Sequence, residues 1–545
     1  MGDINVYIDY SERVDGLSLI FPVFFFAITL LVSFTTITRM VEDERTIIGT
    51  YKALGYPNKE IAKKFFIYGM LASLIGGVLG AVSGSYVLPY IIGNAYSTKT
   101  IFEQNLLIKM FPLKMIFAII VGFVFTAVAA ALSVNKTVKE KTAALLRPKP
   151  PAKGNRILLE KIPFIWDHMS FLSKVTARNL FRSKKRMLMT ILGVLGCAAL
   201  LVLGFGIADV VKDVETLQFD NIIKYNVQVL YDSELFPDDY DKYREEIDKE
   251  HYDYTRVYDE IFTTEYKETD QEINVLVPDD LNNFSNYFAA KDTSTGEVLD
   301  LSKRGAVVSE KLAKIKKLKV GDTLRIKDVY GNEFDVEISG ICELYLGHFM
   351  VMNKDYYETV TGSRFVPNTD LFKFNKNFDI EKFAQNHIKN KSVMNVTDMH
   401  DSRVHLNQFL YSIKQVELVI LVVSTILELV VLYNLTNINI EERIREVSTI
   451  KVLGFQPREA TIYIYKETYI LAAIGIAVGL AVGKLLHYTV IQIVVPYMAM
   501  LPEHLTFRPF LYSAIITAII NVAMMFIFHF KIKKINPLDA LSSVE

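Results

Sequence analysis

Glu428 is the residue whose type and position point most directly to chemistry, because it is the one carboxylate deep within an apolar run, Thr425-Ile-Leu-Glu-Leu-Val-Val431. Acids inside a bilayer are costly and often serve proton or substrate transfer, so Glu428 is a candidate intramembrane acid. No second acid or histidine follows at helical spacing to complete a proton relay. Glu428 could instead be neutral or be paired within a helix bundle, and these interpretations stay open.

Other patterns with catalytic potential are weak. The run Gly479-Leu-Ala-Val-Gly483-Lys484-Leu485 is superficially like a phosphate-binding loop, which requires four residues between the glycines and Ser or Thr after the lysine. The nine histidines are scattered without metal-ligand spacing, and no nucleophile lies in a pattern with a base. The sequence therefore predicts no enzyme, no metal site and no cofactor in this chain.

The composition indicates a membrane protein. Of 545 residues, 51% are hydrophobic and only 22% are charged, which is too apolar for a soluble enzyme of this size. The net charge of −1 gives no basic field for nucleic acid. A transmembrane helix needs about 20 apolar residues. Seven segments qualify: Leu17–Thr38, Phe66–Ile92, Leu113–Val134, Met187–Val210, Val416–Asn437, Tyr469–Val494 and Phe510–Phe530.

The charges of the loops predict the topology. Residues 136–186 hold 14 Lys and Arg against three Asp and Glu, which places them in the cytoplasm. Alternation of the spans then puts the N-terminal residues 1–16 and the long segment 211–414 outside, and the C-terminus inside. Within that segment, period-two strands flank a Gly331-Asn332 turn and predict a hairpin. The expected fold is a polytopic α-helical membrane protein with one mixed α/β extracellular domain.

The sequence repeats itself at a distance of 399 residues. This shift lays Glu42–Gly55 on Glu441–Gly454, and the register continues without gaps into the next span. Two glycine stripes then coincide, and such stripes allow close approach of helices in lipid. The helix-packing candidates are Gly76, Gly80 and Gly84 in the first copy, and Gly475, Gly479 and Gly483 in the second.

The repeat defines the expected domain organisation. Two parallel three-span repeats cover residues 17–146 and 415–545. Between them lie a basic cytoplasmic linker with an amphipathic helix (147–186), a fourth span (187–210) and the extracellular domain (211–414). The second repeat is preceded by a span and an exterior domain, and the first is not. We therefore expect a truncated or split version of a longer permease, with residues 1–16 as a remnant of its exterior part.

Each repeat carries a short amphipathic helix between its first and second spans, at about 42–55 and 441–454. Gly55 and Gly454 are suited to the left-handed position that ends such a helix. A helix of this kind can lie in the lipid interface or insert into a groove on a partner.

Several of these segments carry a family resemblance. The endings Lys52-Ala-Leu-Gly55 and Lys451-Val-Leu-Gly454, the glycine stripes and the terminal Asn536-Pro-Leu-Asp-Ala-Leu541 resemble the FtsX/MacB-like permeases of ABC transporters. Arg178-Asn-Leu-Phe-Arg182 and Asn434-Leu-Thr-Asn-Ile-Asn-Ile-Glu-Glu-Arg443 are similar to the long duplicated permeases of Gram-positive bacteria.

The resemblance implies a permease subunit of the bacterial plasma membrane that works by mechanotransmission. Its two coupling helices would dock on a separate ABC ATPase dimer, which would bind ATP and Mg²⁺, and motion would pass to the extracellular domain. The implied contact residues are Arg45, Lys52, Leu54, Gly55 and Tyr56, with Arg445, Lys451, Leu453, Gly454 and Phe455.

The substrate stays open between a lipid, a lipoprotein, a peptide and a drug, and an extracellular lipoprotein, peptide or cell-wall hydrolase is a further expected partner. Two alternatives remain beside the ABC permease. One is an ATP-independent membrane-anchored extracellular protein for binding or sensing. The other is a secondary transporter, which would depend on Glu428 alone.

Overall fold

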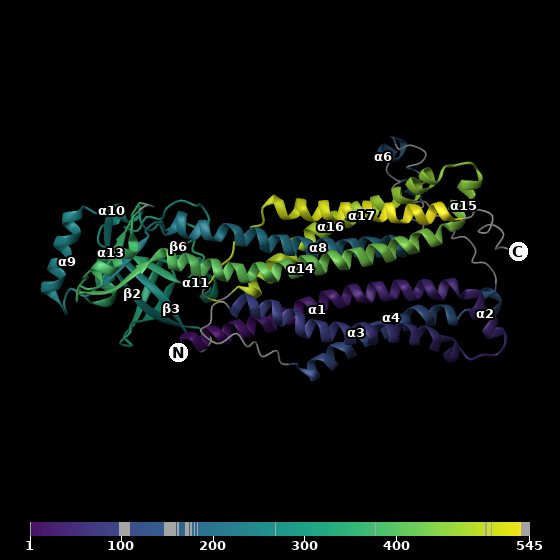
Figure 1. The fold of residues 1–545 in the computed structure, drawn as a ribbon, viewed down its shortest axis with the longest axis horizontal. Helices are drawn as coiled ribbons and strands as arrows, with labels where there is room; N and C mark the ends of the chain where they lie inside the picture. Colours follow the sequence, from purple (N-terminus) through teal and green to yellow (C-terminus); the bar gives the residue numbers. More distant parts are fainter. Residues whose placement is uncertain are drawn as a thin grey trace. The chain divides into compact units, whose positions relative to one another are not determined.

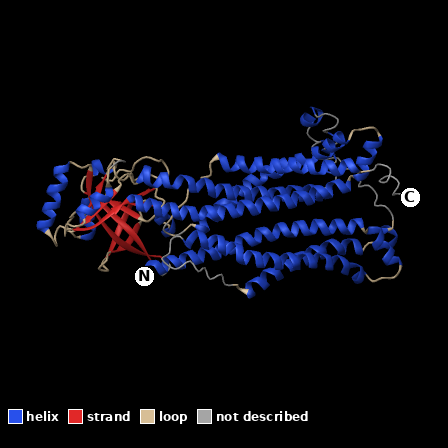
Figure 2. Cartoon of the chain, in the orientation of Figure 1, coloured by secondary structure: helices blue, strands red, loops and turns tan. Residues whose placement is uncertain are grey.

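The computed structural model describes residues 2–97, 110–146, 160, 163–168, 174, 177–178, 180–181, 184–266, 269–375, 378–495, 497, 499–502 and 504–535 (Figure 1). The chain divides into two compact units. One, the helical unit, comprises Leu17–Asp209, Lys414–Val490 and Leu505–Glu545. The other comprises Met1–Gly16, Val210–Ile413 and Ile491–His504, and its central part holds all the described strands (Figure 2).

Seven helices are long and apolar enough to cross a membrane, as the sequence predicted. Their apolar portions are Pro22–Asp43, Asn58–Val87, Pro112–Asn135, Met187–Ile222, Ile413–Glu441, Pro457–Ile493 and Phe507–Lys534. The complete helices are α1 (Gly2–Asp43), α3 (Asn58–Ser97), α4 (Pro112–Val138), α8 (Lys184–Thr216), α14 (Met399–Glu442), α16 (Pro457–Val494) and α17 (Phe507–Lys534). The shorter helices outside the strand-bearing domain are α2 (Arg45–Ala53), α5 (Thr142–Leu145), α6 (Pro163–His168) and α15 (Ile444–Val452).

The first helix differs from its expected start. The sequence separates polar residues 1–16 from a span that begins at Leu17, whereas α1 is helical from Gly2. Polarity marks where a helix leaves the apolar layer and does not mark where the helix itself begins. The same holds for α8 and α14, which extend beyond the predicted spans.

The helix boundaries reproduce the sequence repeat. The two helices predicted to be coupling helices, α2 and α15, begin and end at positions that differ by 399 residues, and that name is kept for them below only as a label. The same shift relates the ends of α1 and α14, at Asp43 and Glu442, and the starts of α3 and α16, at Asn58 and Pro457. The two copies therefore share their local structure as well as their sequence pattern.

Helix α8 is the most enclosed of the spans. In its most apolar window 72% of the residues are buried, against 11% to 28% for the other six. Its glycines face neighbouring helices: a Cβ on Gly193 would lie 2.9 Å from Leu435 of α14, and one on Gly196 would lie 3.1 Å from Ile28 of α1. The span between the two repeats thus packs closely against a helix of each of them.

The extracellular domain contains a four-stranded antiparallel lobe. Its elements follow in the order β1 (Val227–Tyr231), α9 (Pro237–Glu250), β2 (Tyr254–Tyr266), β8 (Thr369–Phe372), α13 (Ile380–His387) and β9 (Val393–Asp398). The strands pair in the order β2-β8-β1-β9. This is the split βαβ arrangement of ferredoxin-like folds. Its core is aromatic and includes Tyr231, Tyr243, Phe372 and Phe383.

A second lobe is inserted between β2 and β8. Strands β3 (Thr269–Pro278), β7 (Phe349–Met352), β4 (Ala306–Ser309), β6 (Glu333–Cys342) and β5 (Thr323–Lys327) pair in that order, and β5 pairs with β2. Because β2 also pairs with β3, these six strands close into a ring. Three short helices, α10 (Leu281–Phe284), α11 (Glu310–Lys316) and α12 (Lys354–Thr361), and a π-helical turn η2 (Leu217–Ile222) complete the domain.

The long strand β2 joins the two lobes. Its first residues, Tyr254–Val257, pair with β8, and Val257–Tyr266 pair with β3. The predicted hairpin of β5 and β6 is confirmed, with Gly331 in the left-handed region at φ +86°. The domain is a mixed α/β fold, as expected.

Candidate coupling site

Each coupling helix ends in a Schellman motif. At the end of α2 the Tyr56 amide donates to the Tyr51 carbonyl over 3.0 Å, and the Gly55 amide donates to Lys52 over 3.1 Å. Gly55 has a φ of +89°, which only glycine adopts without strain. The predicted left-handed glycine is confirmed here.

The second coupling helix ends in the same way. The Phe455 amide donates to the Ile450 carbonyl over 3.3 Å, and the Gly454 amide donates to Lys451 over 3.1 Å, with a φ of +93° at Gly454. The duplicated Lys-x-Leu-Gly pattern therefore encodes one local structure twice.

The motif presents apolar side chains outward. Leu54 is 69% exposed and Leu453 is 71% exposed, and the aromatic residues Tyr56 and Phe455 are about half exposed beside them. We call Leu54, Gly55 and Tyr56 the first tip, and Leu453, Gly454 and Phe455 the second tip. Each tip is therefore a small exposed apolar surface on a hydrogen-bonded turn.

The opposite face of each coupling helix is packed. Ile48 of α2 and Val447 of α15 are each 1% exposed. A Cβ on Gly49 would lie 3.0 Å from the Cβ of Leu145, so α2 packs closely on α5. Such helices are fixed to the spans by one face and are free on the other.

The number of candidate spans between α2 and α15 determines whether the two tips lie on the same side of the membrane. Four candidate spans, α3, α4, α8 and α14, lie between α2 and α15. If each crosses once, both tips lie on the same side, and the domain between α8 and α14 lies on the other.

The basic candidates of the first coupling helix turn inward. Arg45 Nη2 donates to Glu140 Oε2 over 2.5 Å and to the Ala144 carbonyl over 3.0 Å. Lys52 and Lys451 donate to backbone carbonyls at the ends of α4 and α17. The side chain of Arg445 lies outside the described residues. The expected ATPase contact stays a prediction for these basic residues and for the two tips alike.

The second glycine stripe packs against α8. Added Cβ atoms would lie 2.8 Å from the Val194 Cβ at Gly475 and 2.8 Å from the Ala198 Cβ at Gly479. At Gly483 the distance to the Val202 Cβ would be 2.6 Å. Side chains other than hydrogen do not fit at these distances, so the glycines allow the two helices to meet backbone to backbone.

The first stripe has no such neighbour. A Cβ on Gly76, Gly80 or Gly84 would meet no atom within 4 Å among the described residues. The packing role predicted for this copy is therefore not found in this structure. Helix α3 instead turns other glycines to its neighbours: Gly69 faces Ile37 and Thr126, and Gly77 faces Ile119.

Glu428 is fully buried in α14, and neither carboxyl oxygen has a hydrogen-bond partner among the described residues. Ser424, one turn earlier, and Thr517 on α17 are also buried. No proton relay leads from it through the described residues, and a transport role for Glu428 stays a hypothesis.

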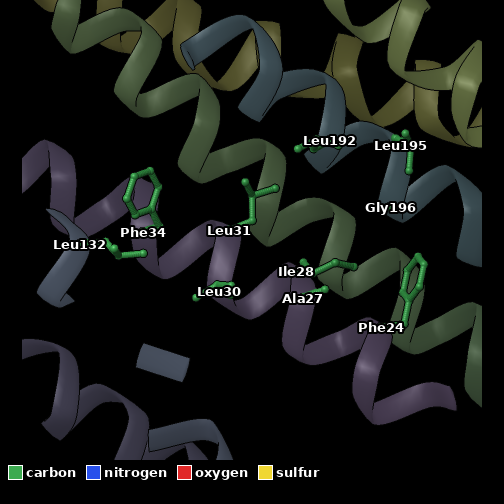
Figure 3. A pocket seen from close by; sticks show the side chains of 10 residues that line it. All are labelled: Phe24, Ala27, Ile28, Leu30, Leu31, Phe34, Leu132, Leu192, Leu195 and Gly196. Carbon is green, nitrogen blue, oxygen red and sulfur yellow. The ribbon is translucent and has the colours of Figure 1, made fainter. Parts of the chain in front are cut away.

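An apolar groove of about 440 Å³ lies between α1, α4 and α8 (Figure 3). Its walls include Phe24, Leu31, Phe34, Leu132 and Leu195. This lining offers dispersion contacts and no polar anchor, so it does not select a substrate by hydrogen bonding.

A buried ion pair anchors the extracellular lobe of β1, β2, β8 and β9. Arg244 of α9 pairs with Asp370 of β8, which is fully buried and also accepts a 2.8 Å hydrogen bond from the Tyr243 hydroxyl. Burial raises the pKa of Asp370 to about 6, against the opposing effect of Arg244. Four tyrosine rings surround the guanidinium. The pair is a structural element of the core.

Among the described residues no group of three or more His, Cys, Asp or Glu side chains could hold a metal ion.

Two family models match the chain. The FtsX-like permease C-terminal model matches twice, at residues 19–142 and 418–537, and the MacB-like periplasmic core domain model matches residues 187–385. Together they cover most of the sequence. The chain belongs to the FtsX/MacB-like permeases of ABC transporters.

Three solved structures match part of this chain at low identity and low TM-score. The extracellular domain of the noncanonic ABC-type transporter YknZ from Gram-positive bacteria is 16% identical, with 31% of this chain and 100% of that chain covered and a TM-score of 0.21. The periplasmic region of MacB from Actinobacillus actinomycetemcomitans is 9% identical, with 36% and 98% covered and a TM-score of 0.21. A domain of a putative permease from Porphyromonas gingivalis is 12% identical, with 30% and 82% covered and a TM-score of 0.18. No curated protein sequence matches this chain significantly.

Proposed function

We propose that this permease couples ATP hydrolysis by a separate ATPase to motion of its extracellular domain. The observation that carries the proposal is the pair of equivalent tips, each an exposed apolar turn on a helix whose other face is packed against the spans. One tip per repeat matches the two subunits of an ATPase dimer. ATP and Mg²⁺ belong to that partner.

The proposed orientation follows from the charges of the loops. The tips and the C-terminus lie in the cytoplasm of a bacterial cell, and the N-terminus and the domain between α8 and α14 lie outside. The cargo belongs to the classes open to this family: a lipid, a lipoprotein, a peptide or a drug. Control of a cell-wall hydrolase by the extracellular domain is the other outcome of the same motion.

Co-purification from membranes tests the proposal. The ATPase encoded beside this chain is co-expressed with the wild type and with a Leu54→Asp, Leu453→Asp double variant, because a charge on each tip opposes insertion into an apolar pocket. The matched control is Tyr330→Asp, a similar change at an exposed aromatic residue of the β5–β6 turn. The expected result is a complex in the wild type and the control that is lost in the double variant.

Failure of the wild type to retain the ATPase would reject the proposal. The chain would then be better described as an ATP-independent membrane-anchored protein for extracellular binding or sensing.

A further inference from the structure

Lys52 and Lys451 make equivalent contacts in the two repeats. Lys52 Nζ donates to the Val138 carbonyl over 2.8 Å and to the Glu140 carbonyl over 2.7 Å. Val138 is the last residue of α4, the third span of the first repeat. Each bond joins the coupling helix to the cytoplasmic end of a span more than eighty residues away in sequence.

The second lysine reaches the corresponding place. Lys451 Nζ donates to the Ile535 carbonyl over 2.6 Å, and the Ile532 and Lys533 carbonyls lie at 3.4 Å. These residues form the last turn of α17, the third span of the second repeat, and the residue that follows it. The contact is therefore duplicated together with the sequence.

The chemistry of a helix end accounts for the attraction. The last four carbonyls of a helix have no partner within it and carry the negative end of the helix dipole. An ammonium group has three donors and can bind several of these oxygens at once. Lysine is therefore well suited to hold the carboxyl end of a span.

The surroundings of the two lysines differ. In the first repeat α2 also packs on α5 through Gly49, and Arg45 binds Glu140. In the second repeat Ser448 replaces Gly49, and the salt bridge nearby runs from Lys531 to Glu441. The lysine contact is preserved while its neighbours change, which separates it from general packing.

We propose that Lys52 and Lys451 are positioning residues that tie each coupling helix to the third span of its own repeat. When the ATPase moves a tip, the lysine carries the displacement to α4 or α17. This inference rests on the proposed function. It assigns docking to the tips and transmission to the lysines.

The test separates docking from transmission. Lys52→Met and Lys451→Met keep the apolar stems and remove the donors, and Lys59→Met, at an exposed lysine near the start of α3, is the matched control. The full chain is reconstituted with the ATPase in nanodiscs. ATP, Mg²⁺ and orthovanadate are added, and hydrogen–deuterium exchange is measured over residues 210–413.

We expect the double Met variant to retain the ATPase and to show a roughly five-fold smaller nucleotide-dependent change in exchange than wild type, in keeping with a coupling free energy at the low end of the usual range. Lys52→Arg with Lys451→Arg should restore part of the change, because arginine also donates to carbonyls. The Lys59→Met control should respond as wild type does.

Two results would overturn the inference while leaving the proposed function intact. One is a full nucleotide response in the double Met variant, and the other is loss of docking in that variant. If the double variant does not fold, the single variants Lys52→Met and Lys451→Met are measured in the same exchange assay. Each is expected to weaken the nucleotide-dependent change in exchange. A wild type that binds no ATPase would reject the proposed function and this inference with it.

Discussion

The two repeats share their helix boundaries but differ in what surrounds their second spans. The stripe Gly475, Gly479 and Gly483 on α16 is filled by α8, whereas Gly76, Gly80 and Gly84 on α3 meet no described atom. The same glycine motif is thus packed against another helix in the second repeat and has no described neighbour in the first. A small-residue stripe gives a helix the capacity for close approach, and the partner must come from elsewhere in the fold.

The ion pairs near the coupling helices also differ between the repeats, because the pair in the second repeat is buried and the pair in the first is not. Glu44 and Arg443 occupy equivalent positions, but Glu44 pairs with Lys64 near the surface, whereas Arg443 pairs in the interior with Glu467, whose equivalent in the first repeat is Tyr68. By burial the second repeat is the more completely packed half, since 24% to 28% of the residues in the apolar windows of its spans are buried, against 11% to 17% in the first repeat.

The largest expected difference between the repeats concerns these ion pairs. Glu467→Ala leaves Arg443 buried without its partner, and we expect the free energy of unfolding to fall by about 3–5 kcal/mol. Glu44→Ala breaks a half-exposed pair and should cost less than about 1 kcal/mol. Unfolding of the purified chain in mixed detergent and SDS measures both. Equal losses in the two variants would contradict the difference in packing.

The glycine stripes should respond differently to the same substitution. Gly479→Leu should destabilise the chain by about 3 kcal/mol, at the upper end of the overpacking range, because the added Cβ would lie 2.9 Å from the Leu195 carbonyl oxygen, a backbone atom. Gly80→Leu meets open space and should change the stability by less than about 0.5 kcal/mol.

The same SDS titration compares the two variants. A large loss in Gly80→Leu would show that the first stripe is occupied by another helix in the purified protein, and the comparison between the repeats would then have to be revised.

A smaller effect concerns pH and should be confined to the domain inserted between α8 and α14. His348 is buried with both ring nitrogens unpartnered, and burial beside Lys311 lowers its pKa to about 4. Its pKa in the unfolded chain is the higher of the two. The contribution of His348 to the stability of the domain is therefore fully present above pH 6.5 and is lost as the pH falls toward 4, whereas the raised pKa of Asp370 acts in the opposite direction.

His348 alone should contribute a loss of about 2 kcal/mol in the free energy of unfolding between pH 7 and pH 5. Urea titration of the full chain, with brief proteolysis to detect cleavage within residues 210–413, measures this contribution as the difference between the wild type and His348→Gln. Because glutamine does not titrate, the variant should lose about 2 kcal/mol less than the wild type over this range. An unchanged pH dependence in that variant would exclude His348 as the cause.

Local patterns in the sequence predicted much of this structure. The seven spans follow from the length of the apolar runs, and the left-handed Gly55 and Gly454 follow from the Lys-x-Leu-Gly ending. The β5–β6 hairpin follows from alternation around Gly331. In each case the signal lies within a few residues, so that no tertiary information is needed.

The remaining features depend on contacts between distant segments. The closed ring of strands requires β2 to pair with both β3 and β5, and nothing in the local sequence specifies those partners. Lys52 and Lys451 look like surface charges on amphipathic helices, yet each binds a span that follows about eighty residues later. The alignment of the two repeats contains a signal for this contact, because a lysine at equivalent positions in both copies is consistent with an equivalent structural contact in each.

The central claim is that each repeat of this permease offers one docking tip to one ATPase subunit. Native mass spectrometry of the complex, released from detergent with ATP bound to a hydrolysis-deficient ATPase, measures the stoichiometry directly. The account predicts two ATPase subunits for each permease chain, weakened binding in Leu54→Asp or Leu453→Asp alone, and no complex in the double variant. A complex that is insensitive to both substitutions would contradict it.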